Sequence, residues 1–463
     1  MGSCLRRSFR RFGSRKPESA DGNGRARVVA EQRTMASPQD DRPVAVIRLW
    51  GQRVGAVAED SAGSVTFEFD EEFRRSGLDI SPLQLPLSRR GPLTFPELTR
   101  TPGFGGLPGV LADSLPDDFG NRVIRRYFHQ AGRAGAELSP VQRLLYMGSR
   151  AMGALEYEPA YAPPGAATVE ALEVASLVGQ ARSLIEGDAD AAIPEIMRVG
   201  GSAGGARAKA LVLWNHAVNR VRSGFAAPEA GDQPWIIKFD GVQRGSGGLT
   251  ADASYAALPY GRTEYVYSVM ARAAGIDMEP THLLEERGFG HFMTRRFDRT
   301  AGDRLHMHSL GGLQHVDFNE QFAFSYEDYF RMIRALHLGQ PAVNEAYRRM
   351  VFSFATLNRD DHVKNFSFLM DREGRWRLAP AYDVAYAAHS PWTRQHQMSA
   401  NGKHLDFTRE DLLEIGSRFD VPRRGSAIID QVVESLALWS STALDAGLDR
   451  EWIKALDGEF VRF

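Results

Sequence analysis

A polar loop followed by a short hairpin is the feature that most restricts how this chain can fold. The loop reads Asn358-Arg359-Asp360-Asp361-His362-Val363-Lys364-Asn365. Strand-like residues follow at 366–369 and again at 376–378, and Asp383 comes soon after the second run. Two strand-like runs separated by a short polar turn predict a β-hairpin. Because a hairpin returns the chain to where it began, we expect Asp360, Asn365 and Asp383 to lie around one element.

These residue types suit phosphoryl transfer from ATP. One carboxylate can accept or orient the proton of an attacking hydroxyl, while an Asn amide oxygen and a second carboxylate hold Mg²⁺ against the phosphates. The same D-x-x-x-x-N spacing occurs in the catalytic loop of protein kinases. Two alternatives remain at this point. The loop could be an ordinary polar turn, and Asp383 could be a turn-forming Asp after a proline.

A glycine-rich segment at 200–209 is a second candidate phosphate site. It contains Ser202, Gly204 and Gly205, and it ends in Lys209. Glycines let backbone N–H groups approach a phosphate, and nearby cations complete such a site. It is not a Walker-type loop, because Lys209 is followed by Ala210 and leads into a strand instead of a helix. The alternative is a hairpin turn.

Lys238 is a third candidate, because it lies in an otherwise apolar strand-like run, 235–239. A Lys that points into a core is costly unless it is paired, and kinases place such a Lys against the ATP phosphates. The alternative is an edge-strand Lys that faces water. We expect no metal site at His362, which has no second His at a ligand spacing. We expect His306 and His308 to lack partners and to face solvent.

Composition excludes several classes of protein. The 463 residues predict two or three domains, and a net charge of −2 does not indicate a nucleic-acid surface. The lone Cys4 excludes an intrachain disulfide and a Cys metal cluster, which fits a reducing cytoplasm. No apolar run approaches the ~18–20 residues that span a bilayer.

The first 34 residues carry nine Lys or Arg against three acidic residues and have no signal-peptide core. They could be an organelle-type leader or a disordered tail. We favour a third interpretation, in which translation starts at Met35.

Strand-like runs at 44–50, 54–57 and 65–69 predict a small antiparallel sheet. Residues 111–129 have helical spacing, and the proline-rich stretch 157–167 is the best linker. The remaining expected elements are helices over 169–186 and 264–274, strands over 210–214 and 291–297, and a mostly helical region from about 320 onward.

Taken in order, five segments resemble the HipA family, the serine/threonine-kinase toxins of type II toxin–antitoxin systems. The resemblance covers nearly the whole chain after the leader, and the D-x-H-x-K-N-x-S form is specific. The matching segments are 201–209, 236–238, 296–299, 360–367 and 379–384.

The resemblance implies a role for each matching residue. Asp360 would be the catalytic base, with Asp361 in the variable position, and Lys364 would lie near the transferred phosphate. Asn365 and Asp383 would hold Mg²⁺. Autophosphorylation of Ser202 would eject the glycine-rich loop and silence the enzyme. The implied nucleotide-binding positions are Ser202, Gly204, Gly205, Lys209, Lys238, Arg295, Phe297 and His362.

Two departures from the family pattern concern the nucleotide site. The stretch 294–297 resembles the hinge through whose backbone the family binds adenine, and it carries Arg295 where the family often has Glu. In the glycine-rich loop, Arg207 and Ala208 replace Gln and Glu of the best-known member. We expect ATP binding to survive the first change, because the backbone makes the main contacts.

We therefore predict an α/β (α+β) protein with a small β-rich N-terminal domain at 42–165 and a kinase-like domain at 166–463. The latter comprises an ATP lobe at about 166–300 and a helical lobe at about 301–463, after a leader at 1–41. The resemblance implies ATP and Mg²⁺ as cofactors, and a protein substrate, with aminoacyl-tRNA synthetases as a candidate class. It also implies a helix-turn-helix antitoxin through which any DNA contact is made, and a cytoplasmic location. The rival functions are a nucleotide-binding corepressor and a small-molecule kinase.

Overall fold

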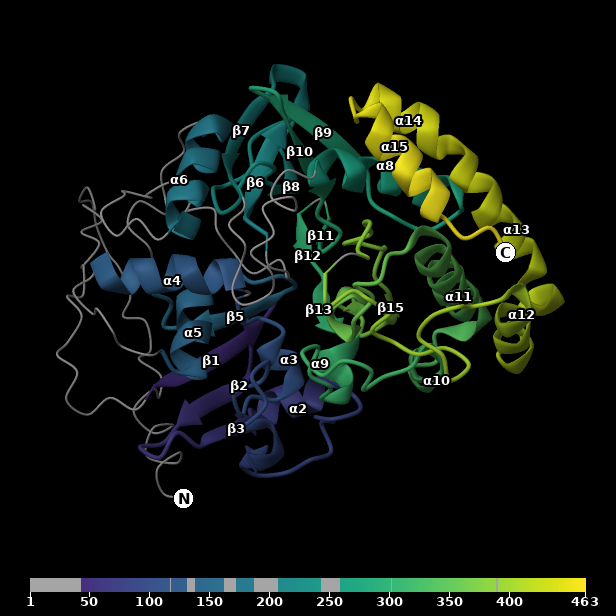
Figure 1. Cartoon of the computed structure of the whole chain (residues 1–463). Coiled ribbons are helices and arrows are strands. Elements are labelled where there is room, and N and C mark those ends of the chain that lie inside the picture. Colours follow the sequence, from purple (N-terminus) through teal and green to yellow (C-terminus); the bar gives the residue numbers. More distant parts are fainter. Residues whose placement is uncertain are drawn as a thin grey trace.

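The computed structural model describes residues 43–116, 118–130, 138–161, 172–186, 207–242, 259–300, 302–388 and 390–463. Three parts follow one another along the chain (Figure 1). A first sheet with its helices lies at the N-terminal end, a second sheet follows, and a helical half completes the molecule. A small sheet of β13 (His306–Ser309), β14 (Ser367–Met370) and β15 (Trp376–Leu378) lies between the first sheet and the helices.

The first sheet confirms the strands expected near the N-terminus. Its order is β4-β3-β2-β1-β5, and all neighbouring strands are antiparallel. Alternate residues of β1 are buried, as a sheet with one covered face requires. The last strand, β5, extends two residues into the predicted linker. The strands are β1 (Val44–Leu49), β2 (Gln52–Glu59), β3 (Val65–Phe69), β4 (Leu93–Thr94) and β5 (Leu155–Glu158).

The single helix predicted over 111–129 is wrong, because it is divided into two. Helix α3 (Gly109–Ala112) ends before Pro116, and α4 (Asp118–Gln130) begins after it. Proline has no N–H to donate and clashes with the preceding turn, so a helix does not continue through it. The other helices of this part are α2 (Glu71–Ser76), α5 (Pro140–Met147) and α6 (Val174–Glu186). Residues 169–171 of the helix predicted over 169–186 lie outside the described residues.

The second sheet has the order β7-β6-β8-β10-β9 and is antiparallel throughout. Every residue of β6 is buried, so both faces of the sheet are covered at this strand. Helix α8 (Tyr260–Ala273) packs against β9 and β10. The strands are β6 (Lys209–Asn215), β7 (Arg220–Ser223), β8 (Gln233–Lys238), β9 (Thr281–Glu286) and β10 (Phe289–Arg295).

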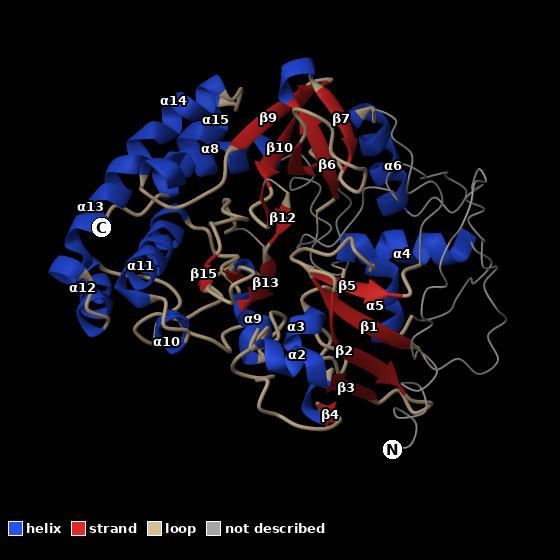
Figure 2. Ribbon diagram, turned by 180° about the vertical axis from the view of Figure 1, so that it is seen from behind, coloured by secondary structure: helices blue, strands red, loops and turns tan. Residues whose placement is uncertain are grey.

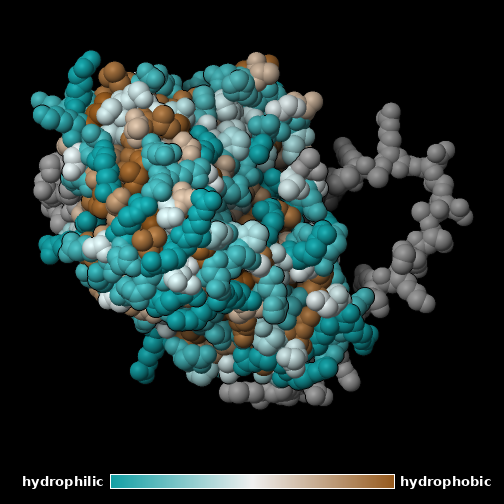
Figure 3. Space-filling view, turned by 90° about the vertical axis from the view of Figure 1, so that its right-hand side faces the viewer, coloured by the Kyte–Doolittle hydropathy of each residue, from teal (hydrophilic) through white to brown (hydrophobic). Residues whose placement is uncertain are grey.

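The region after residue 320 is mostly helical, as predicted, apart from the hairpin β14 (Ser367–Met370) and β15 (Trp376–Leu378). The helices surround a second hydrophobic core, which also includes the buried side of α8 (Figure 2). On the face seen in Figure 3, hydrophobic residues lie in separate groups among hydrophilic ones. The remaining elements are β11 (Arg299–Thr300), β12 (Asp303–Arg304), β13 (His306–Ser309), α9 (Leu310–Gln314), α10 (Tyr326–Ala335), α11 (Gly339–Thr356), α12 (Arg409–Arg418), α13 (Ser426–Ser435), α14 (Trp439–Asp445) and α15 (Arg450–Glu459).

The N-terminal part and the helical half meet where α3 crosses α9. A Cβ on Gly109 would lie 2.0 Å from the carbonyl oxygen of Gly312, so the two backbones touch without side chains between them. The half-buried Asp113 carboxylate accepts hydrogen bonds from the N–H and hydroxyl of Ser309 and lies 2.6 Å from Nδ1 of His308. The contact between α3 and α9 therefore requires glycine at position 109 and hydrogen-bond partners for the Asp113 carboxylate.

The expectation that His306 and His308 face solvent is wrong. Both side chains are fully buried at this interface. Nε2 of His306 lies 2.9 Å from the carbonyl oxygen of Ile80, and Nε2 of His308 lies 3.0 Å from the hydroxyl of Ser81. Ile80 and Ser81 lie more than 220 residues earlier in the chain, so no local sequence pattern could indicate these contacts.

We predict that acid lowers the free energy of unfolding, because His306 and His315 are held uncharged between the two parts of the protein. Burial lowers the pKa of His306 to about 4 and that of His315 to about 4. Nε2 of His315 also accepts a hydrogen bond from the N–H of Gly109, which a protonated ring could not do. Below the ordinary pKa of ~6.5, the unfolded chain takes up these protons and the folded chain does not. Unfolding free energy should therefore fall as pH falls from about 6.5 to about 4, by up to roughly 3 kcal/mol for each histidine.

Urea titrations across this pH range would measure the slope. Replacing His315 with Asn should flatten it, since Asn accepts the Gly109 hydrogen bond, tolerates the left-handed backbone of this position and does not titrate. His337→Asn is the matched control, because His337 is exposed and shares that backbone conformation. An unchanged slope in His315→Asn would contradict the assignment.

Candidate active site

The structure brings Asp360, Asn365 and Asp383 together around one cavity of about 400 Å³. Asn365 ends a single 3-10 turn after the polar loop, and its side-chain N–H group donates to the backbone carbonyl of Asp360 at 2.8 Å. Asp383 follows the β14–β15 hairpin and has a left-handed backbone, with φ of 56°. Two residues of the polar loop and one that follows the hairpin therefore face one space.

Lys238 lies at the end of a central strand, β8, and not at a sheet edge. Its amine forms ion pairs with Glu264 of α8 and with Asp383, and its side chain is 13% exposed. Burial would lower the pKa of Lys238, but the two carboxylates raise it, so the amine stays charged. This residue joins the second sheet to the hairpin of the helical half.

Two further cations surround Asp383. Lys209 lies directly opposite Lys238 in the β6–β8 ladder and is 2% exposed. Arg207 lies 3.8 Å from Glu264. Burial would raise the pKa of the Asp383 carboxyl, but Lys238, Lys209 and Arg207 outweigh it and hold that pKa well below its usual range. These three cations lie on the Asp383 side of the cavity, where positive charge suits contact with a polyphosphate.

The oxygen atoms at the cavity fit a magnesium ion. Asn365 uses its N–H group for Asp360, which leaves its amide oxygen for a ligand, and Asp383 adds a carboxylate. Within the described residues, no group of three or more His, Cys, Asp or Glu could hold a metal. Two protein oxygens suffice for Mg²⁺ when phosphates supply others, which is how this ion is bound at nucleotide sites.

Backbone hydrogen bonds to neighbouring segments hold the predicted hinge, 294–297, in place. The N–H groups of Arg295 and Arg296 donate to the carbonyls of Pro280 and Pro234, whereas that of Phe297 has no hydrogen bond to any described residue. The Arg295 side chain points elsewhere and pairs with Glu279 at 2.7 Å. A base bound here would therefore find the Phe297 N–H free.

A buried ion cluster ties this hinge to the N-terminal part. The Asp298 carboxylate accepts from Arg296 and Arg299, and also from the backbone N–H of Gly153 at 2.7 Å. The Gly153 carbonyl in turn accepts from Arg299 and Arg304, each at 3.0 Å. Burial would raise the pKa of Asp298, but Arg296 and Arg299 lower it, so the carboxylate stays charged.

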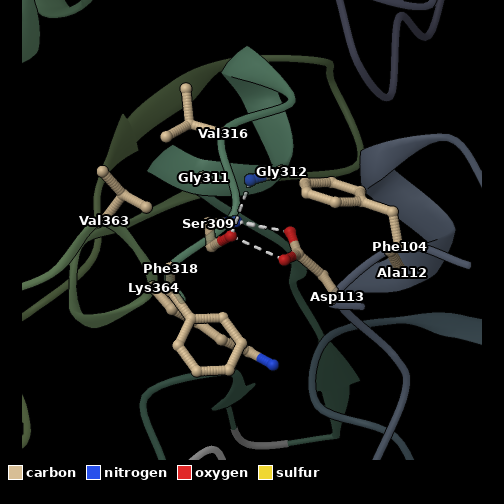
Figure 4. A pocket seen from close by; sticks show the side chains of 11 residues that line it. Phe104, Ala112, Asp113, Ser309, Gly311, Gly312, Val316, Phe318, Val363 and Lys364 are labelled. Atoms are coloured by element: carbon tan, nitrogen blue, oxygen red, sulfur yellow. Dashed lines mark hydrogen bonds between the residues drawn. The ribbon is translucent and has the colours of Figure 1, made fainter. Parts of the chain in front are cut away.

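Lys364 lines a neighbouring cavity of about 270 Å³ rather than the one shared by Asp360, Asn365 and Asp383. Its amine lies 5.1 Å from the centre of the Phe318 ring, and Asp113 and Ser309 form the opposite wall (Figure 4). The ring of His362 caps the turn before Asn365, with Nδ1 accepting from the N–H of Lys364. Nε2 of His362 lies 3.8 Å from Oδ1 of Asp360. In this structure His362 therefore stabilises the turn of the polar loop.

Some expectations lie outside the described residues, and some neighbours were missed. Ser202, Gly204 and Gly205 fall in the segment 187–206, which is not described. Glu264 and Trp392 contact the site or its loop, but no motif indicated them, and the family pattern gave Asp361 no role. Only the cost of a lone buried Lys238 pointed to a partner such as Glu264.

An antiparallel sheet with a Lys–Glu ion pair, facing a helical half that presents two Asp and an Asn, is the arrangement of a kinase-like fold. The family model "HipA-like C-terminal domain" matches residues 201–439, and "HipA N-terminal domain" matches 45–158. The chain belongs to the HipA family.

Known relatives agree with this assignment. The Sinorhizobium fredii protein named "Putative kinase Y4dM" is 24% identical over 416 residues, which cover 85% of this chain and 91% of the relative. A Haemophilus influenzae protein named "Putative kinase" is 31% identical over 112 residues, or 22% of this chain and 32% of the relative. These names and the family match support a HipA-like kinase.

A solved structure shares the fold. HipA of Shewanella oneidensis MR-1, in complex with HipB and its operator DNA, superposes with a TM-score of 0.60 at 15% identity. The match covers 90% of this chain and 95% of that one. None of the described helices is long and apolar enough to cross a membrane.

Proposed function

We propose that this chain is a serine/threonine protein kinase, which transfers the γ-phosphoryl group of ATP to a Ser or Thr hydroxyl of a protein. The observation that carries the proposal is the shared cavity of Asp360, Asn365 and Asp383, with Lys238 paired to Glu264 beside it. A base, two oxygen ligands for a metal and a cation for the phosphates are what this reaction requires.

In this proposal Asp360 accepts the proton of the attacking hydroxyl as its oxygen bonds to the γ-phosphorus and the bond to ADP breaks. Lys238 and Lys209 contact the phosphates, and the hinge around Phe297 holds the adenine. Asn365 and Asp383 would hold Mg²⁺, which when bound neutralises charge on the phosphates. The family resemblance would place Lys364 near the transferred phosphate, whereas its side chain here lines the neighbouring cavity.

We further propose that the chain is the toxin of a toxin–antitoxin pair. The solved HipA was bound to HipB and operator DNA, which supports a helix-turn-helix partner here and an indirect contact with DNA. Autophosphorylation at Ser202 would silence the enzyme, because up to about two added negative charges would expel the loop from a phosphate site. The domain limits at 42–165 and 166–463 and a cytoplasmic location belong to the same proposal.

Intact mass of the purified protein, with and without Mg·ATP, tests the kinase activity. We expect a gain of one phosphate, mapped to Ser202, that EDTA prevents. Ser202→Ala should remove that gain while phosphate transfer to another protein persists. ATP binding without transfer to any protein would instead favour the nucleotide-binding corepressor. Phosphate on a small acceptor alone would favour the small-molecule kinase.

A further inference from the structure

The loop 390–397 returns to the catalytic loop and touches both of its neighbouring carboxylates. It follows Asp383 by a few residues and then passes beside Asp360 and Asp361. The indole N–H of Trp392 donates to Oδ1 of Asp360 at 3.2 Å. This contact reaches the residue that the proposed function makes the base, from a position 32 residues later in the chain.

Asp361 anchors this loop. Its carboxylate is 1% exposed and accepts from the Tyr326 hydroxyl at 2.8 Å and from the backbone N–H of Gln397 at 2.7 Å. Nδ1 of His396 lies 2.9 Å from the same carboxylate. A buried carboxylate is costly unless such partners surround it, so the loop and Asp361 require each other. The position that the family pattern leaves variable is structural in this chain.

The backbone of Trp392 is held as well. Its carbonyl accepts from the side-chain amides of Gln321 at 2.9 Å and Gln397 at 2.6 Å. The carbonyl of Arg394, two residues on, accepts from Arg359 at 2.9 Å. Gln321, Gln397 and Arg359 therefore hold the backbone from which the Trp392 indole projects.

The two oxygens of Asp360 consequently differ. Oδ1 receives the indole N–H, and Nε2 of His362 lies 3.8 Å from it. Oδ2 has no hydrogen bond to any described residue, and Asp360 faces the cavity that it shares with Asn365 and Asp383. A carboxylate held by one oxygen presents the other in a fixed direction.

We propose that Trp392 is a positioning residue, which holds Asp360 through Oδ1 so that Oδ2 faces the acceptor hydroxyl. The inference rests on the proposed kinase function. In the transfer step the hydroxyl proton passes to Oδ2, the hydroxyl oxygen bonds to the γ-phosphorus, and the P–O bond to ADP breaks with its electrons on the departing ADP. In this step Trp392 keeps its own proton and acts only through its hydrogen bond to Asp360.

Trp392→Phe tests the inference, because Phe keeps a flat ring and lacks the N–H donor. We expect kcat to fall roughly tenfold or more, the effect of one hydrogen bond to a charged group, while KM for ATP stays within about twofold. Trp214→Phe is the matched control. The Trp214 indole also donates at 3.2 Å, to Asn219, but at the opposite end of β6 from Lys209.

A second measurement does not depend on turnover. The chain has seven Trp, and the indole N–H signal of Trp392 in an ¹⁵N spectrum is assigned by its loss in Trp392→Phe. In Asp360→Ala that signal alone should shift strongly. If it does not move, or if kcat of Trp392→Phe matches that of Trp214→Phe or exceeds wild type, the inference is wrong while the kinase assignment stands. A wild-type chain that transfers no phosphate would overturn the proposed function and the role of Trp392 with it.

Discussion

Replacing Asp360 with asparagine should lower kcat for phosphate transfer by about 10²–10⁴-fold, the usual contribution of a positioned proton acceptor. Asparagine has the same size and can still accept the Trp392 N–H, but it cannot take a proton from the acceptor hydroxyl. ATP affinity should stay close to that of wild type, because Lys238, Lys209 and the hinge remain. Transfer of labelled phosphate and calorimetric titration with ATP would measure the two quantities.

Asp371→Asn provides the matched control on the same hairpin. Asp371 lies in the turn between β14 and β15, where it accepts from the backbone N–H groups of Glu373 and Arg375. This change removes one carboxylate a few residues along the chain from Asn365 and should leave kcat unchanged. Normal phosphate transfer by purified Asp360→Asn would eliminate Asp360 as the base.

Gly109→Ala should destabilise the protein by about 1–3 kcal/mol or more, the cost of forcing extra atoms into a packed contact. The new Cβ would lie 2.0 Å from the Gly312 carbonyl oxygen, and a backbone atom cannot rotate away as a side chain can. Helices α3 and α9 would have to separate, which would also disturb the Asp113–Ser309 hydrogen bonds between the two parts. The midpoint of thermal or urea unfolding would report the loss.

Gly458→Ala is the corresponding control in α15. A Cβ there would meet nothing within 4 Å. Alanine favours a helix interior over glycine by about 1 kcal/mol, so this variant should be neutral or more stable. Equal midpoints for the two variants would show that the α3–α9 crossing is not a tight backbone contact.

The sequence predicted the parts of the site that depend on local order. Asn365 and Asp383 flank a hairpin, so their proximity follows from two short strands and a turn. Lys238 was identifiable because a charged residue interrupts an apolar strand. The mixed α/β fold and its division into a strand-rich and a helical part were also readable from hydrophobic periodicity.

Contacts between distant segments were not predictable in this way. Glu264 pairs with Lys238 across a sheet–helix boundary, and Trp392 reaches Asp360 from a loop without regular structure. His306 and His308 looked like solvent-facing residues because their partners, Ile80 and Ser81, belong to another part of the chain. In each case burial and partner are properties of the tertiary packing, and no spacing along the chain encodes them.

The hydrogen bonds of Asp298, Arg299 and Arg304 to the N–H and carbonyl groups of Gly153 have a thermodynamic consequence. The peptide belongs to the N-terminal part, and the residues that hold it directly follow Phe297, where we propose that the adenine binds. A ligand of the N-terminal part that favours one setting of this segment changes the affinity for ATP. By reciprocity, ATP must then change the affinity for that ligand by the same factor. The binding of ATP would then change the ligand affinity of a surface on the N-terminal part that ATP does not contact.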